Sequence, residues 1–112
     1  MTRPNEPPRT ADQIILFSKM TAKPGQRADL CKLLTGGLKK IETDEPGTLS
    51  IVLVEDENKP DVCYVMERFK DQEAVDAHMK GSAAVRDQFA SYIQERESIF
   101  AKAVAGFVSK HE

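Results

Sequence analysis

Apolar and polar positions alternate with two different periods in the first half of the chain. Residues 13–20 form a short apolar run with β-branched and aromatic side chains, which is typical of a β-strand. In residues 26–43 the period becomes helical, and one apolar stripe is formed by Leu30, Leu33, Leu34, Leu38 and Ile41. Gly36 and Gly37 cost this helix about 1 kcal/mol each relative to alanine. We interpret the glycine pair as a sign of close backbone packing.

The middle of the chain predicts a β-hairpin. Residues 48–55 and 62–69 are apolar runs of strand length, and the short link at 56–61 is polar. Both runs are apolar at odd and at even positions, so each strand presents apolar side chains to both faces of a sheet. Because a sheet with one face in water alternates apolar with polar residues, the second face also needs cover.

The last part of the chain predicts two helices and a fourth strand. Asp71 can cap a helix over residues 72–80. A further helix is predicted from residue 83 to the high nineties, and a fourth strand over residues 104–110. The element order then predicts an α+β, ferredoxin-like fold: a four-stranded antiparallel sheet with helices on one face. The simplest way to cover the other, apolar face of the sheet is homodimerisation through it. The alternative is a monomer in which the C-terminal tail covers this face.

Composition narrows the class of protein. A chain of 112 residues is the length of one domain, which we place at 12–112 after a disordered arm at 1–11 that contains three prolines. No run approaches the ~18 apolar residues of a membrane span. The formal charge of -2 gives no reason to expect nucleic acid as a partner. Cys31 and Cys63 lack metal spacing, so we expect reduced thiols in a cytoplasmic protein and no metal site.

His78 and Glu67 are the candidate catalytic residues. His78 follows Ala74 and Val75 by one helical turn and therefore points toward the sheet. A carboxylate such as Glu67 near the end of an apolar strand needs a partner if it faces inward. A carboxylate beside an imidazole can fix its tautomer and raise its basicity, as a general base requires. The alternatives are that His78 is a packing residue and that Glu67 pairs with an arginine or lysine.

Four short stretches resemble the antibiotic biosynthesis monooxygenase (ABM) family: Lys23-Pro24-Gly25, Glu45-Pro46-Gly47-Thr48-Leu49, Glu67-Arg68-Phe69 and Ala77-His78. The resemblance covers about residues 13–90. It implies a dimeric α/β barrel with a pocket between sheet and helices, bordered by His78, Glu67 and Phe69. The haem-degrading branch of the family has an Asn, a Trp and a haem-ligating His at positions that here hold Ser18, His78 and Gln88. We therefore expect no haem and no other cofactor.

The resemblance implies a cofactor-independent monooxygenase that uses O2 to oxidise a small phenolic or quinol-type aromatic to a quinone. In this hypothesis His78 is the general base and Glu67 orients it. The expected substrate-binding residues are Phe17, Ser18, Val65, Phe69 and Phe89. Two alternatives remain: an isomerase of a small signalling or metabolic molecule, and a non-catalytic ligand-binding or stress-response dimer.

Overall fold

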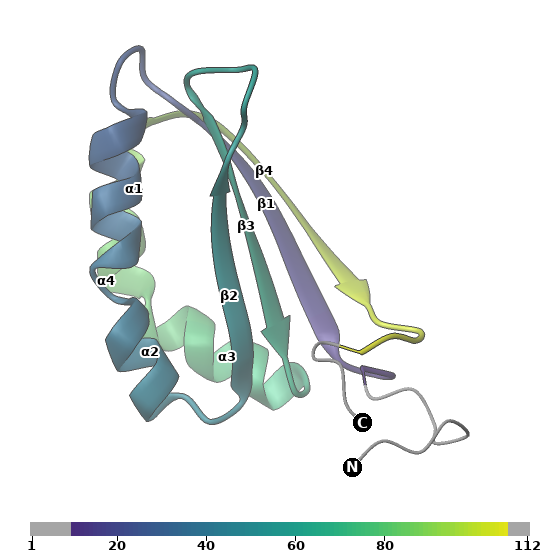
Figure 1. Ribbon diagram of the computed structural model, residues 1–112. Helices are drawn as coiled ribbons and strands as arrows, with labels where there is room; N and C mark the ends of the chain where they lie inside the picture. Colours follow the sequence, from purple (N-terminus) through teal and green to yellow (C-terminus); the bar gives the residue numbers. More distant parts are fainter. Residues whose placement is uncertain (1–9, 108–112) are drawn as a thin grey trace.

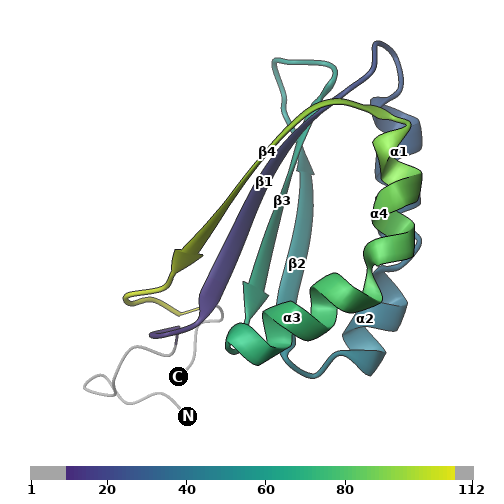
Figure 2. The ribbon, with the colours of Figure 1, turned by 180° about the vertical axis from the view of Figure 1, so that it is seen from behind.

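The computed structural model describes residues 10–107, which fold into one antiparallel sheet with helices on one side (Figures 1 and 2). The strands lie in the order β2-β3-β1-β4. The elements in chain order are β1 (Ile14–Ala22), α1 (Arg27–Thr35), α2 (Leu38–Asp44), β2 (Thr48–Glu55), β3 (Val62–Phe69), α3 (Gln72–Gly81), α4 (Ala83–Ala90) and β4 (Ile93–Lys102). This is the predicted ferredoxin-like α+β fold. The expected N-terminal arm lies almost entirely outside the described residues.

The central strands have the predicted bounds and pairing. β2 and β3 coincide with the runs at 48–55 and 62–69 and pair antiparallel, as the short polar link between them predicts. β1 lies between β3 and β4 and pairs antiparallel with both. Asp71 caps α3 as predicted, since its Oδ1 accepts a hydrogen bond from the backbone N–H of Ala74 at 2.9 Å.

The prediction of one helix over 26–43 is wrong, because the chain forms two helices there. α1 ends at Thr35, Gly36 and Gly37 separate the helices, and α2 begins at Leu38. Glycine has the lowest helix propensity after proline, so two in a row make a helix easy to interrupt. The break lets α2 change direction and places the chain that follows it beside α3 (Figure 1).

The fourth strand also differs from the prediction. α4 ends at Ala90, and the segment expected to continue it is the strand β4. Residues 104–107 form no strand, and 108–110 lie outside the described residues. β4 is an edge strand rich in charged residues, as edge strands commonly are. Its charged residues interrupt the alternation of apolar and polar positions by which a strand is recognised. Its pairing with β1 is a long-range contact, which a local sequence pattern does not show.

The two faces of the sheet differ in cover. The helix-covered face carries Leu16, Met20, Cys63 and Phe69, each at most 2% exposed. The helix-free face carries large apolar side chains that are 46–65% exposed: Phe17, Val52, Val54, Met66 and Ile99. This agrees with the prediction that β2 and β3 are apolar on both sides. Among the described residues, no helix has the length and apolar character needed to cross a membrane.

Candidate active site

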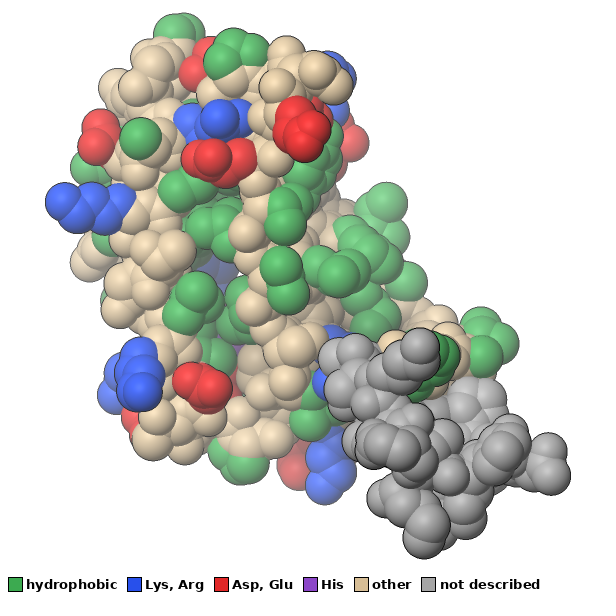
Figure 3. Space-filling view, in the orientation of Figure 1, with side chains coloured by type: hydrophobic (Ala, Val, Ile, Leu, Met, Phe, Trp, Pro, Cys, Tyr) green, Lys and Arg blue, Asp and Glu red, His purple; other side chains and the backbone are tan. Residues whose placement is uncertain are grey.

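A cavity of about 200 Å³ lies between the helices and the helix-covered face. In Figure 3, hydrophobic side chains surround this hollow. Most of the wall is apolar and comes from the sheet and from all four helices; examples are Leu16, Met20, Ile51, Leu53, Val65 and Val85. Polar and charged side chains make up the rest of the wall, and a mainly apolar lining with some polar groups is the usual composition of a small-molecule site.

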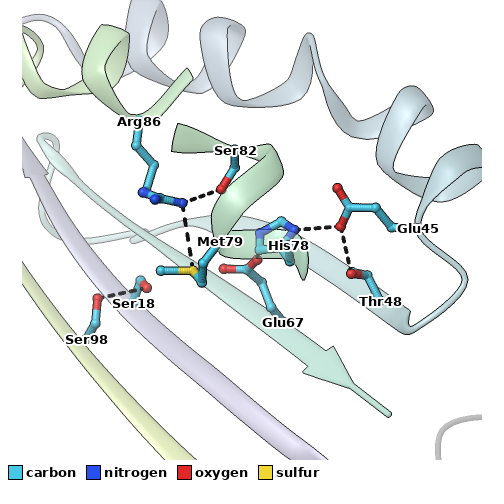
Figure 4. A network of polar contacts seen from close by, with 9 residues as sticks. All are labelled: Ser18, Glu45, Thr48, Glu67, His78, Met79, Ser82, Arg86 and Ser98. Carbon is cyan, nitrogen blue, oxygen red and sulfur yellow. Dashed lines mark hydrogen bonds and ion pairs between the residues drawn. The ribbon is translucent and has the colours of Figure 1, made fainter. Parts of the chain in front are cut away.

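His78 is held between two carboxylates at one side of this cavity (Figure 4). Its Nδ1 lies 2.8 Å from Oε1 of Glu45, and its Nε2 lies 2.9 Å from Oε1 of Glu67. The imidazole is only 6% exposed and Glu67 only 8%. Both ring nitrogens of His78 are therefore engaged, and they can both donate to carboxylates at the same time only when the ring is an imidazolium.

Each member of this cluster comes from a different element. His78 lies on the inward face of α3, and Glu67 lies on β3 beside Leu16 of β1 and Ile51 of β2. Glu67 thus faces inward as expected, and its partner is the imidazole instead of an arginine or lysine. Behind the imidazole lies the fully buried ring of Phe69, with ring centroids 5.2 Å apart and planes tilted by 51°.

Glu45 is the functional residue that the sequence reasoning missed. It caps the C-terminus of α2, and its Oε1 also accepts a hydrogen bond from Oγ1 of Thr48 at 2.9 Å. The loop approaches α3 closely: a Cβ on Gly47 would stand 2.5 Å from Cβ of Ala74. Glu45 was part of a stretch that carried the family resemblance, but no periodicity pointed its side chain at His78.

The environment favours the charged form of His78. Burial of the imidazole lowers its pKa, but the hydrogen bonds and negative charges of Glu67 and Glu45 outweigh burial and raise the pKa above the ordinary value of 6.5. With His78 protonated, the cluster of one cation and two anions keeps one negative charge. The carboxylate of Glu67 has no other hydrogen bond or ion pair among the described residues, so its Oε2 is available to a ligand in the cavity.

The expected substrate-binding residues divide into three groups. Ser18, Val65 and Phe89 line the cavity, and Oγ of Ser18 lies 3.1 Å from Oγ of Ser98. Phe69 does not line the cavity but packs against His78. The expectation that Phe17 lines the same pocket is wrong, because side chains alternate along β1 and Phe17 points to the helix-free face.

Two arginines that the sequence reasoning did not single out also line the cavity. Arg86 lies on α4 and Arg96 on β4. Nη1 of Arg86 donates to Oγ of Ser82 and to Sδ of Met79, the latter at 3.8 Å (Figure 4). Within residues 10–107, no group of three or more His, Cys, Asp or Glu side chains has an arrangement that could hold a metal ion.

Comparisons with known proteins agree with this fold. The family model described as antibiotic biosynthesis monooxygenase (ABM) matches residues 13–86. A Chloroflexus aurantiacus structure assigned to that family is 26% identical, with a TM-score of 0.73 over 86% of this chain and 97% of that one. A Nitrosomonas europaea protein of unknown function is 24% identical, with a TM-score of 0.76 over 91% and 99%.

A more distant structure carries a more specific description. It is a mutant of SnoaB, a cofactor-independent oxygenase from Streptomyces nogalater, 15% identical with a TM-score of 0.73 over 83% of this chain and 94% of that one. The comparison with curated protein sequences gave no match.

Proposed function

The chain belongs to the antibiotic biosynthesis monooxygenase family, and from this premise we propose that it is a cofactor-independent monooxygenase. Its substrate in this proposal is a small phenolic or quinol-type aromatic, which O2 oxidises to a quinone. The observation that carries the proposal is the Glu45–His78–Glu67 cluster in the wall of a cavity whose lining is mainly apolar. Removing a phenolic proton requires such a group, and the step that follows requires that water be excluded.

The cluster accepts the substrate's proton at Glu67. General base catalysis by His78 itself was the expectation, but both of its ring nitrogens are bonded to carboxylates. The free oxygen of Glu67 is the acceptor within reach of the cavity. Taking up one proton there neutralises the excess negative charge of the cluster, which is favourable at a buried site. His78 then acts as the charged partner that holds Glu67 in place, and Glu45 keeps His78 charged.

The oxidation balances with O2 as the only other reactant. The phenolate passes one electron to O2, and the resulting phenoxyl radical and superoxide combine by forming a carbon–oxygen bond. The peroxide anion takes back the proton from Glu67, so the cluster acts as base and then as acid. Cleavage of the O–O bond, with loss of the ring C–H proton, releases water and leaves the quinone. One oxygen atom enters the product and the other leaves in water.

The test is oxygen uptake with a panel of one-ring and two-ring phenols and quinols. We expect one O2 consumed per quinone formed, without added metal, flavin or haem. Wild-type protein and the His78→Ala variant are measured side by side, and circular dichroism of both checks that the variant is folded. Equal uptake by the two proteins, or no uptake with any member of the panel, would contradict the proposal.

An isomerase is the second candidate, because the same cluster can move a proton between two positions of one substrate without O2. The two functions separate under argon, where a monooxygenase stops and an isomerase continues. A non-catalytic binding protein would bind members of the panel and convert none of them in air or under argon.

We also propose that the protein works as a homodimer in the cytoplasm. The helix-free face exposes five large apolar side chains around a second hollow of about 340 Å³, and a second copy of the chain can cover it. Cys31 and Cys63 are both free thiols, as expected in a reducing compartment.

A further inference from the structure

Arg86 and Arg96 are the charged groups of the cavity wall that have no charged partner among the described residues. The remaining charged side chains of the wall do have one. Nζ of Lys40 lies 3.3 Å from Oδ2 of Asp44, and His78 lies between its two carboxylates. The cavity wall therefore carries two guanidinium groups that no charged side chain of the described residues compensates.

The charges of the wall do not cancel. Lys40 and Asp44 neutralise each other, and the cluster around protonated His78 keeps one negative charge. The two arginines add two positive charges, so the wall carries one positive charge in excess. A ligand with one negative charge would compensate it. This compensation is stronger at half-buried Arg86 than at exposed Arg96, because water screens it less at Arg86.

The hydrogen bonds of Arg86 point to the same kind of ligand. Arg86 is half-buried, and within residues 10–107 only its Nη1 has partners, both of them neutral: a hydroxyl and a thioether sulfur. Nε and Nη2 keep donors for a further acceptor. The planar fork of a guanidinium matches the two oxygens of a carboxylate, and this bidentate pair is among the strongest hydrogen-bonded contacts in proteins.

From these observations we propose that the substrate is a hydroxyaromatic carboxylate, with its hydroxyl at Glu67 and its carboxylate at Arg86. This rests on the proposed function for the position of the hydroxyl. Arg96 supplies the second positive charge, and the apolar wall holds the ring between the two ends. A cavity of about 150 Å³ in another protein holds benzene. The cavity of about 200 Å³, which is partly open, therefore suits one ring or two fused rings.

Binding of matched ligands under argon tests this inference separately from turnover. The ligands are 6-hydroxy-2-naphthoate and its methyl ester, which have the same ring and hydroxyl but differ in charge. Isothermal titration calorimetry should give the acid at least ~10-fold tighter binding than the ester, the usual gain from a hydrogen bond to a charged group. Arg86→Gln should weaken binding of the acid by ~10- to 100-fold and leave binding of the ester nearly unchanged.

Two further variants define the role of Arg86. Arg86→Lys keeps the charge but loses the fork, so the affinity for the acid should lie between those of the wild type and Arg86→Gln. Lys39→Gln is the matched control, because Lys39 is exposed on α2 outside the cavity wall, and it should change neither ligand. Equal binding of acid and ester, equal weakening of both by Arg86→Gln, or no binding of either would overturn the inference.

The outcomes distinguish this inference from the proposed function. Tight binding of the acid that depends on Arg86, without oxygen uptake by any phenol, would support the ligand class and refute the monooxygenase. Oxygen uptake with neutral quinols, together with equal binding of acid and ester, would refute the ligand class and leave the monooxygenase standing.

Discussion

The two faces of the sheet are built from neighbouring residues of the same strands, yet they differ in almost every property. Along β3, Val65 and Glu67 point to the helices and are buried, while Met66 between them is 47% exposed on the helix-free face. The helix-covered face combines a packed core with a polar cluster in a cavity, and the centre of the helix-free face is mainly apolar. In the proposed function this difference becomes a division of roles: the helix-covered face would carry the chemistry, and the helix-free face would form the dimer interface.

The largest effect that we expect from this division is on catalysis. Glu67→Gln removes the proton acceptor and should lower kcat by about 10²–10⁴-fold, the usual range for a positioned base. Glu97→Gln makes the same chemical change on the helix-free face, where Glu97 borders the second hollow, and should leave kcat close to the wild-type value. Steady-state oxygen uptake measures both. Similar losses in the two variants would refute the assignment of chemistry to one face.

The second largest effect concerns the stability of the protein: replacing a phenylalanine on the helix-covered face should destabilise it more than replacing one on the helix-free face. Phe69→Ala empties a fully buried site and should cost ~3–5 kcal/mol in the free energy of unfolding. Phe17→Ala changes a half-exposed side chain and should cost ~1 kcal/mol or less in the monomer, with a further loss that grows with protein concentration. Urea unfolding at two protein concentrations separates these terms. The idea fails if both variants lose the same free energy at every concentration.

A charge on the helix-free face should then weaken association. Val52→Asp would bury an unpaired carboxylate in the proposed interface, so the dimer dissociation constant should rise by at least ~10-fold. Sedimentation velocity measures this dissociation constant. The control is Lys39→Asp on exposed α2, which should sediment like the wild type. A wild-type protein that is monomeric at micromolar concentration would refute the interface.

Much of this fold, but less of the site, could be predicted from the sequence. The runs at 48–55 and 62–69 are long and apolar enough to be found locally, and Asp71 is a recognisable helix cap. The break between α1 and α2 falls at Gly36 and Gly37, where the expected close packing is absent: a Cβ on Gly37 would meet nothing within 4 Å, and one on Gly36 only carbonyl oxygens of α1. β4 depends on pairing with a strand some 80 residues earlier. Neither the helix break nor β4 can be predicted from the local spacing of apolar and polar residues.

The site shows the same limit. His78 and Glu67 could be predicted because each is a polar residue on an apolar face. Glu45 could not, because it lies at the C-terminal cap of α2, where no apolar periodicity indicates the direction of its side chain. Phe17 was misplaced because it lies in the apolar run 14–17 of β1, where consecutive apolar residues give no sign of the face to which each one points.

The smallest predicted effect is on the pH dependence of stability. The pKa of His78 is raised in the folded state, so the stabilisation is complete below the ordinary value of 6.5 and is lost as pH rises through the higher folded pKa. Glu45→Gln removes one of the two negative charges and so lowers the folded pKa of His78; the loss should therefore be smaller and complete at lower pH. Thermal melts between pH 6 and pH 9 measure the shift. Coincident profiles for the two proteins would show that Glu45 does not influence His78.

The most direct test of the central claim is the protonation state of His78 in the folded protein. Nitrogen-15 NMR of the imidazole resolves it, because the only other histidine of the sequence is His111. The account predicts that both ring nitrogens of His78 carry protons at neutral pH and that the ring titrates above 6.5. One unprotonated nitrogen at neutral pH, with titration at or below 6.5, would contradict it and return the role of proton acceptor to His78.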